Sequence, residues 1–225
     1  MKVITELLGR VILPVPGEEV VPKEGMIFPE VLAALVRRYH FTVKPDLEKL
    51  SPEDFQAKGY VFRLGKLGEH SISDFTVWET GLTVTARNTE VAEAFLRDAL
   101  KFLAESHEFR TDPLPSKTML MLSELLVEFE EVFDGALKHF DVIAGSLQAA
   151  LGRHYGLHNK YQVNGLTFDF SRELLPQPLN SLAIFGLERR LGRAFSENRY
   201  FCRAPFRTPD HIRLLTEIET LFKGQ

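Results

Sequence analysis

The stretch Ile72–Leu103, ISDFTVWETGLTVTARNTEVAEAFLRDALKFL, decides the fold class of this 225-residue chain. Its first part predicts two strands, 72–77 and 82–86, with a turn between them near Gly81, because apolar and polar residues alternate on both sides of that glycine. Asn88 then predicts a helix start, since its side chain can accept a hydrogen bond from a free N–H of the first turn. The helix that follows would bury one apolar stripe: Val91, Phe95, Ala99, Phe102 and Leu103.

Similar patterns extend to both sides of this unit. Before it, the sequence predicts a strand at 11–16, a helix from Pro29, a short helix from Ser51 and a strand at 60–64. After it come a strand at 125–130, a long helix at 133–151 with an apolar stripe that includes Leu147, and a strand at 166–170 that follows the tight turn Asn164-Gly165. A strand at 182–188 and a last helix from Thr208 complete the chain.

The two halves of the chain give the same order of elements. Residues 1–112 and 113–225 each predict strand, helix, strand, strand and helix, and the turn formers at 111–116 mark the boundary between an N-terminal and a C-terminal α+β half. This is the ferredoxin-like order, in which helices cover one face of an antiparallel sheet. We therefore expect an α+β fold with antiparallel sheets covered by helices, either as two ferredoxin-like (βαββα) halves or as one continuous sheet.

Composition and charge limit the setting of the protein. The chain is 44% hydrophobic and 26% charged, which is ordinary for a globular protein, and its net charge of −4 provides no overall attraction to nucleic acid or anionic lipid. The N-terminus resembles no signal peptide, and no stretch approaches the roughly 18 apolar residues of a membrane span. A single cysteine excludes an intrachain disulfide and suits a reducing compartment. We expect a cytoplasmic protein that does not bind membranes.

The segment 188–207, which we call the arginine-rich segment, has the most distinctive composition. It holds six arginines, no lysine and four aromatic residues. Arginine without lysine indicates use of the planar guanidinium, which binds carboxylates, phosphates or aromatic rings. Three uses remain open: ion pairs inside the fold, a protein-binding surface, and a site for nucleic acid or another phosphate ligand.

If this segment binds a partner, its central and C-terminal residues are the candidates. The residues that we expect to contact the partner are Arg193, Arg199, Tyr200, Arg203, Phe206 and Arg207. At the start of the segment, the strand at 182–188 would place Arg189 on the face shared with Phe185 and Leu187 and Arg190 on the other. Arg189 should therefore lie near the core, with a carboxylate partner, and Arg190 near solvent.

Catalytic and metal-binding patterns are weak throughout the sequence. Gly65-Lys-Leu-Gly68 lacks the spacing of a phosphate-binding loop, and His154 with His158 lacks the glutamate of a zinc-protease helix. A run of carboxylates resembles a metal-binding cluster: Glu124, Glu128, Glu130, Glu131 and Asp134. On a strand, however, Glu128 and Glu130 would point away from the apolar residues between them, as on a solvated strand face. Cys202, near several arginines and His211, is the one candidate nucleophile, and an inert packed thiol explains it equally well. We assign no catalytic residue, metal or cofactor.

These observations favour a non-enzymatic cytosolic interaction protein, a subunit or adaptor that binds a protein partner or a second copy of itself through the arginine-rich segment. The alternative is binding of nucleic acid or a phosphate ligand through the same segment. The third hypothesis is an enzyme whose site combines Cys202, His154, His158 and His211.

Overall fold

One antiparallel sheet of eight strands, in the order β2-β3-β4-β1-β5-β8-β7-β6, runs through the whole protein. The computed structural model describes residues 1–22, 28–46, 59–110, 119–130, 141–156, 163–169, 171 and 182–223. The expected α+β class is confirmed, and of the two expected arrangements the sheet is the continuous one. The predicted boundary at 111–116 and the predicted helix from Ser51 lie outside the described residues.

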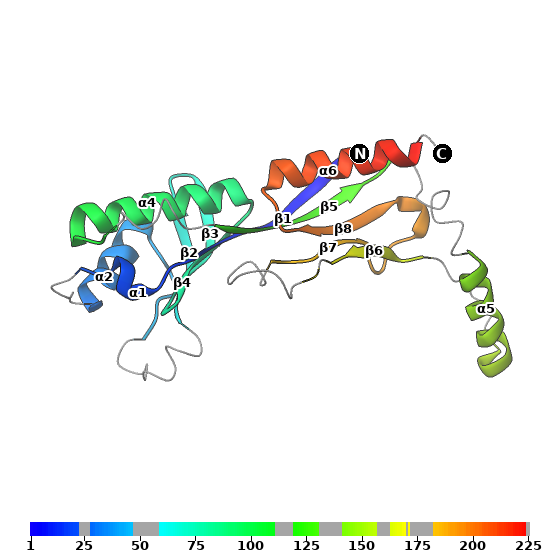
Figure 1. Ribbon diagram of the computed structural model, residues 1–225, viewed down its shortest axis with the longest axis horizontal. Coiled ribbons are helices and arrows are strands. Elements are labelled where there is room, and N and C mark those ends of the chain that lie inside the picture. The colour runs from blue at the N-terminus through cyan, green and yellow to red at the C-terminus, as the bar shows by residue number, and fades with distance from the viewer. Residues whose placement is uncertain are drawn as a thin grey trace.

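The elements follow one another in a simple order. The strands are β1 (Lys2–Pro14), β2 (Tyr60–Leu67), β3 (His70–Trp78), β4 (Gly81–Ala86), β5 (Leu120–Glu128), β6 (Gly165–Phe168), β7 (Phe185–Arg189) and β8 (Arg199–Ala204). The helices are α1 (Gly17–Val20), α2 (Phe28–Tyr39), α4 (Thr89–His107), α5 (Asp141–Tyr155) and α6 (Thr208–Lys223). Figure 1 shows α4 and α6 on the same side of the sheet, one over each half.

The strand β1 is the longest and lies in the middle of the sheet. It pairs with β4 through residues 9–14 and with β5 along most of its length. The sequence predicted a strand at 11–16, which overlaps only the last four residues of β1, 11–14, and continues two residues beyond it. Two register shifts, between Val3 and Thr5 and between Glu6 and Leu8, interrupt the alternation of side chains by which a strand is recognised in sequence.

The two halves share one topology, related by an approximate twofold axis between β1 and β5. In each half a strand and a helix precede a three-strand meander and a second helix: β1, α2, β2–β4 and α4, then β5, α5, β6–β8 and α6. Gly9 of β1 and Ser123 of β5 are directly paired, and they pair with Ala86 of β4 and Ala204 of β8 respectively. Each half therefore has one strand more than the expected order, and in the C-terminal half that strand is β8.

The first residues of α4 and α6 bind each other across this axis. The Thr208 N–H donates to Thr89 Oγ1 at 2.7 Å, the Thr89 N–H donates to Thr208 Oγ1 at 3.2 Å, and both side chains are buried. Beneath them β1 has Gly9, where an added Cβ would lie 1.9 Å from the backbone carbon of Asn88. Each helix N-terminus thus has one of its unpaired N–H groups satisfied by the other half.

The predicted helix starts at Asn88 and Thr208 are confirmed. The Asn88 side chain accepts a hydrogen bond from the Val91 N–H at 3.0 Å, and α6 begins at Thr208. The apolar stripe of α4 is centred slightly differently from the prediction, because Leu96 and Leu100 are buried whereas Val91 and Phe102 are only partly buried. Neighbouring positions on a helix surface exchange roles when the helix rotates against the sheet by a fraction of a turn.

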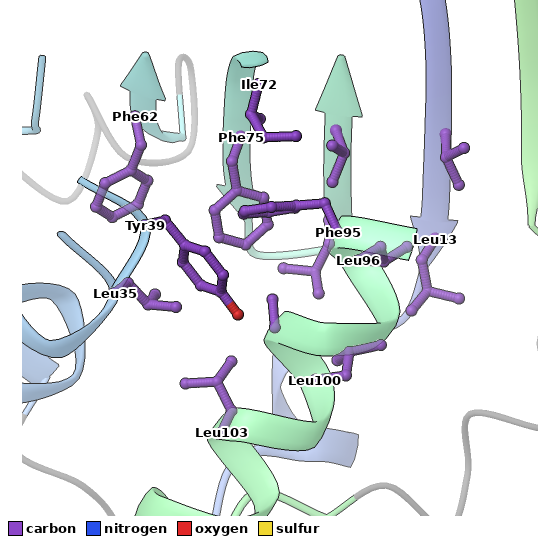
Figure 2. Packing of buried hydrophobic residues seen from close by; sticks show 14 of the residues in the cluster. Leu13, Leu35, Tyr39, Phe62, Ile72, Phe75, Phe95, Leu96, Leu100 and Leu103 are labelled. Carbon is purple, nitrogen blue, oxygen red and sulfur yellow. The ribbon is translucent and has the colours of Figure 1, made fainter. Parts of the chain in front are cut away.

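Most of the buried apolar side chains belong to the N-terminal half, where α2 and α4 cover the sheet (Figure 2). The Tyr39 ring of α2 lies 4.5 Å from the Phe95 ring of α4, and Phe75 of β3 lies 5.3 Å from Phe95. The Tyr39 hydroxyl donates to Asp98 at 2.7 Å, and burial raises the pKa of that hydroxyl. This contact fixes α2 against α4.

The C-terminal half has a smaller core, formed between β5, β7, β8 and α6. In this half α5 has the place in the topology that α2 has in the N-terminal half. Figure 1 shows α5 at the end of the molecule and away from the sheet. Val142, Ile143 and Leu147 of α5 are exposed. The predicted helix at 133–151 is present as α5 within the described residues, and Leu147 of its apolar stripe is exposed, because helical spacing supplies an apolar stripe but not the surface that covers it.

We expect Thr89→Val and Thr208→Val each to lower the free energy of unfolding by about 1–2 kcal/mol, because each leaves a buried N–H of the other residue without its acceptor. The two losses should not be additive, and a double-mutant cycle in urea should give a coupling of at least about 0.5 kcal/mol. Thr83→Val, on the half-exposed face of β4, is the control. Strictly additive losses would contradict the reciprocal contact.

Candidate interaction surface

The arginine-rich segment is divided among several surfaces because six of its residues form β8. Strand alternation places Arg199, Phe201 and Arg203 on one face, and Tyr200, Cys202 and Ala204 on the other. The second set is buried, and Tyr200 is only 3% exposed. This strand is not among those expected from the sequence, in which the alternation of Arg199 and Arg203 with Tyr200, Cys202 and Ala204 is the available signal.

The arginines of β8 bind glutamates that lie directly opposite them on β5. Arg199 Nε lies 3.0 Å from Glu128 Oε2, and Arg203 Nη2 lies 2.8 Å from Glu124 Oε1. The Arg203 guanidinium also lies 5.7 Å from the centre of the Phe201 ring. Opposite charges that face each other across two strands stabilise the pairing of those strands.

The remaining two predicted arginines are also paired with carboxylates. Arg207 binds the buried Glu93 of α4, which also accepts a hydrogen bond from Arg97, and so this ion pair joins the two halves. Arg193 lies 3.9 Å from Glu197. All four arginines that we expected to contact a partner therefore have intramolecular ion pairs. This agrees with the first of the three uses considered from the sequence, which is ion pairing inside the fold.

The most exposed part of the segment is the turn from β7 to β8, residues 190–193, which we call the tip. Leu191 is 88% exposed, and Arg190 and Arg193 flank it at the surface. Two backbone hydrogen bonds hold the base of the tip, from the Arg190 N–H to the Arg199 carbonyl at 2.9 Å and from the Arg189 N–H to the Asn164 carbonyl at 2.7 Å. Leu191 is not among the residues expected from the sequence, although its position directly before the turn residue Gly192 is visible there.

Phe206 lies apart from the tip, at the opposite end of β8. It is 41% exposed and directly precedes Arg207, whose ion pair with Glu93 of α4 joins the two halves. The six residues expected to contact a partner are thus distributed over the tip, the open face of the sheet, its covered face and the junction of the halves.

Arg189 and Arg190 occupy the positions that alternation predicted. Arg189 is 7% exposed, whereas Arg190 is exposed. The Arg189 guanidinium lies 5.3 Å from the centre of the Tyr200 ring, and its Nε donates to the Val163 carbonyl at 3.4 Å. Arg189 therefore contributes to the C-terminal core, and Arg190 belongs to the tip.

Cys202 and His211 are both buried in the C-terminal half. Burial raises the pKa of the Cys202 thiol, which is the opposite of the shift that activates a nucleophile. The His211 Nδ1 shares a hydrogen bond with Ser123 Oγ at 3.1 Å, and burial lowers the pKa of the imidazole to about 4. The two residues have the environment of a packed core.

The other histidines and the acidic residues form no site in the described part of the chain. His154 lies in α5, and His158 lies outside the described residues. Among those residues no group of three or more histidine, cysteine or acidic side chains is placed to hold a metal ion. Glu124 and Glu128 bind arginines instead.

Comparisons with known proteins provide no family for this fold. No protein-family model matches the sequence, and no curated protein matches it either. None of the helices in the described ranges is both long enough and apolar enough to cross a bilayer.

We expect Arg189→Ala to lower the free energy of unfolding by about 1.5–3 kcal/mol, because it removes a charged donor from the half-buried Val163 carbonyl and a cation from the Tyr200 ring. Arg190→Ala should change it by less than about 0.5 kcal/mol. Chemical denaturation measures both. If both substitutions changed the free energy of unfolding equally and by little, Arg189 would have to lie at the surface.

Acidification should destabilise the protein through His211. The folded state lowers the pKa of this imidazole to about 4, whereas the unfolded chain has a value near 6.5, so the unfolded chain binds more protons between these values. The contribution of neutral His211 to the free energy of unfolding is fully present above pH 6.5. It is lost as the pH falls toward 4, and the loss is at most about 3 kcal/mol.

Urea unfolding between pH 7.5 and pH 4.5 tests this expectation. His211→Asn keeps a polar group for Ser123 but does not titrate, so its stability should fall less than that of the natural protein over this range. Parallel pH profiles for the two proteins would contradict a buried neutral imidazole.

Proposed function

We propose that this protein is a non-enzymatic interaction protein, a subunit or adaptor, whose protein partner binds the C-terminal half at the tip. The observation that carries the proposal is the exposure of Leu191, which at 88% is the most exposed large apolar side chain of the described residues and lies between Arg190 and Arg193. Arginine is enriched at protein–protein interfaces relative to the rest of the surface.

The chemistry of the tip supports a protein partner. An exposed leucine between two arginines can enter an apolar pocket while the guanidinium groups bind carboxylates at its rim. The base of the tip is held by its hydrogen bonds to β8 and to Asn164, so that little order has to be gained on binding. We infer a partner with an apolar depression surrounded by acidic residues.

Nucleic-acid binding receives less support. Arg199, Arg203 and Arg207 already bind Glu128, Glu124 and Glu93, and a phosphate would have to compete with these carboxylates. An enzymatic role receives little support from Cys202, whose thiol is buried and protonated at neutral pH. The cytoplasmic location expected from the sequence remains part of the proposal.

The proposal is tested by comparing two leucine substitutions. Leu191→Asp should abolish capture of the partner from a native lysate, because it places a negative charge opposite the inferred acidic rim. Leu64→Asp is the matched control: Leu64 is 62% exposed on β2, and its positive φ of 56° suits aspartate. Quantitative mass spectrometry of the captured material measures the difference.

Size-exclusion chromatography with light scattering, on the natural protein and both variants, shows whether the partner is a second copy. Loss of a partner with Leu191→Asp and retention with Leu64→Asp supports the tip. Equal capture by all three proteins contradicts it. Binding to an oligonucleotide that weakens steeply with salt would favour the nucleic-acid alternative.

A further inference from the structure

A cavity of about 540 Å³ lies at the outer end of the N-terminal half, where α1, α2 and α4 meet the β3–β4 turn. Its walls include buried leucines of the core, among them Leu35 of α2 and Leu100 and Leu103 of α4, which Figure 2 labels. Well-packed cores contain few voids larger than a water molecule, and apolar cavities do not favour water. The volume lies within the range of about 300–1,000 Å³ that is usual for small-molecule sites.

The rim of the cavity is held together by specific hydrogen bonds. The Gly17 N–H at the start of α1 donates to the Glu79 carbonyl of the β3–β4 turn at 2.9 Å. Beyond α4, the Arg110 N–H donates to the Val20 carbonyl at 2.8 Å, and its guanidinium Nε donates to the Val21 carbonyl at 2.9 Å. These bonds connect the three elements that border the opening, so the cavity has a defined wall.

The chemistry of the rim indicates which head group a ligand would have. Tyr60 and Trp78 line the cavity as half-buried aromatic residues, and the two charged residues that line it are the exposed Glu18 and Glu79. No described lining residue is a lysine, arginine or histidine. The neighbouring Arg110 does not line the cavity, and its guanidinium binds the backbone carbonyls of the lining residues Glu18 and Val21. Carboxylates and aromatic faces attract an ammonium group and disfavour an anion.

We propose that this cavity binds a small apolar molecule with an amine head group, whose hydrocarbon part enters the core between α2, α4 and the sheet. The site lies in the other half from the tip and does not depend on the proposed interaction. Ligand binding would stabilise the N-terminal half by filling a void in its core.

The test uses three ten-carbon probes that differ only in the head group: decylamine, decanol and decanoate, each below its micelle-forming concentration at pH 7. Trp78 is the only tryptophan of the chain, so its fluorescence reports occupancy directly. We expect saturable binding with decylamine tightest and decanoate at least tenfold weaker. Absence of saturable binding by all three probes, or decanoate as tight as decylamine, would overturn the proposal.

Substitutions at the rim separate the site from general hydrophobic adsorption. Glu79→Gln should weaken decylamine binding several-fold and leave decanol unchanged, and Thr80→Lys, in the same exposed turn, should reverse the order of decylamine and decanoate. Glu69→Gln, in the turn at the other end of β3, is the matched control and should change nothing. Identical affinities in all three variants would overturn the assignment of the rim.

A cavity-filling variant tests the interior. Val31→Phe places a larger side chain in the wall formed by α2 and should remove binding of every probe in calorimetry, with unchanged circular dichroism. Retained binding by the folded variant would overturn the proposal. If the variant does not fold, the rim variants decide, because their side chains lie in an exposed turn.

Discussion

The antiparallel pairing of β1 with β5 is the contact on which the rest of the structure depends. It joins two meanders that would otherwise be separate sheets, and it brings the N-termini of α4 and α6 close enough for Thr89 and Thr208 to bind each other. Gly9 permits this approach, because any larger residue on β1 would collide with Asn88. The two halves are therefore coupled through the backbone at the centre of the sheet and through a pair of buried hydroxyl groups above it.

The same pairing determines what the arginine-rich segment can do. Because β5 lies next to β8, Glu124 and Glu128 face Arg203 and Arg199, and because α4 lies next to the start of α6, Glu93 reaches Arg207. These ion pairs hold the strands and the halves in register. At the tip, by contrast, Leu191 is exposed between two arginines.

Equivalent topology does not produce equivalent halves. In the N-terminal half α2 covers the meander and binds α4 through Tyr39 and Asp98, and the resulting large core encloses a cavity beside Trp78. In the C-terminal half α5 leaves its apolar side chains exposed, and the core is small. The two ends of the molecule therefore differ in their surfaces: a cavity lies in the N-terminal half, and exposed apolar side chains lie in the C-terminal half.

The sequence by itself determined the α+β class, the helix starts at Asn88 and Thr208, the strands of the first meander and the opposite faces of Arg189 and Arg190. Each of these depends on neighbours within a few residues: a cap, a turn, or strict alternation. Tertiary structure alone decided the length of β1, whose bulges hide the alternation, the exposure of Leu147, and the carboxylate partners of the arginines. These features depend on segments far apart in the chain, such as β5 and β8, and local sequence patterns contain no information about which distant strand supplies the opposite charge.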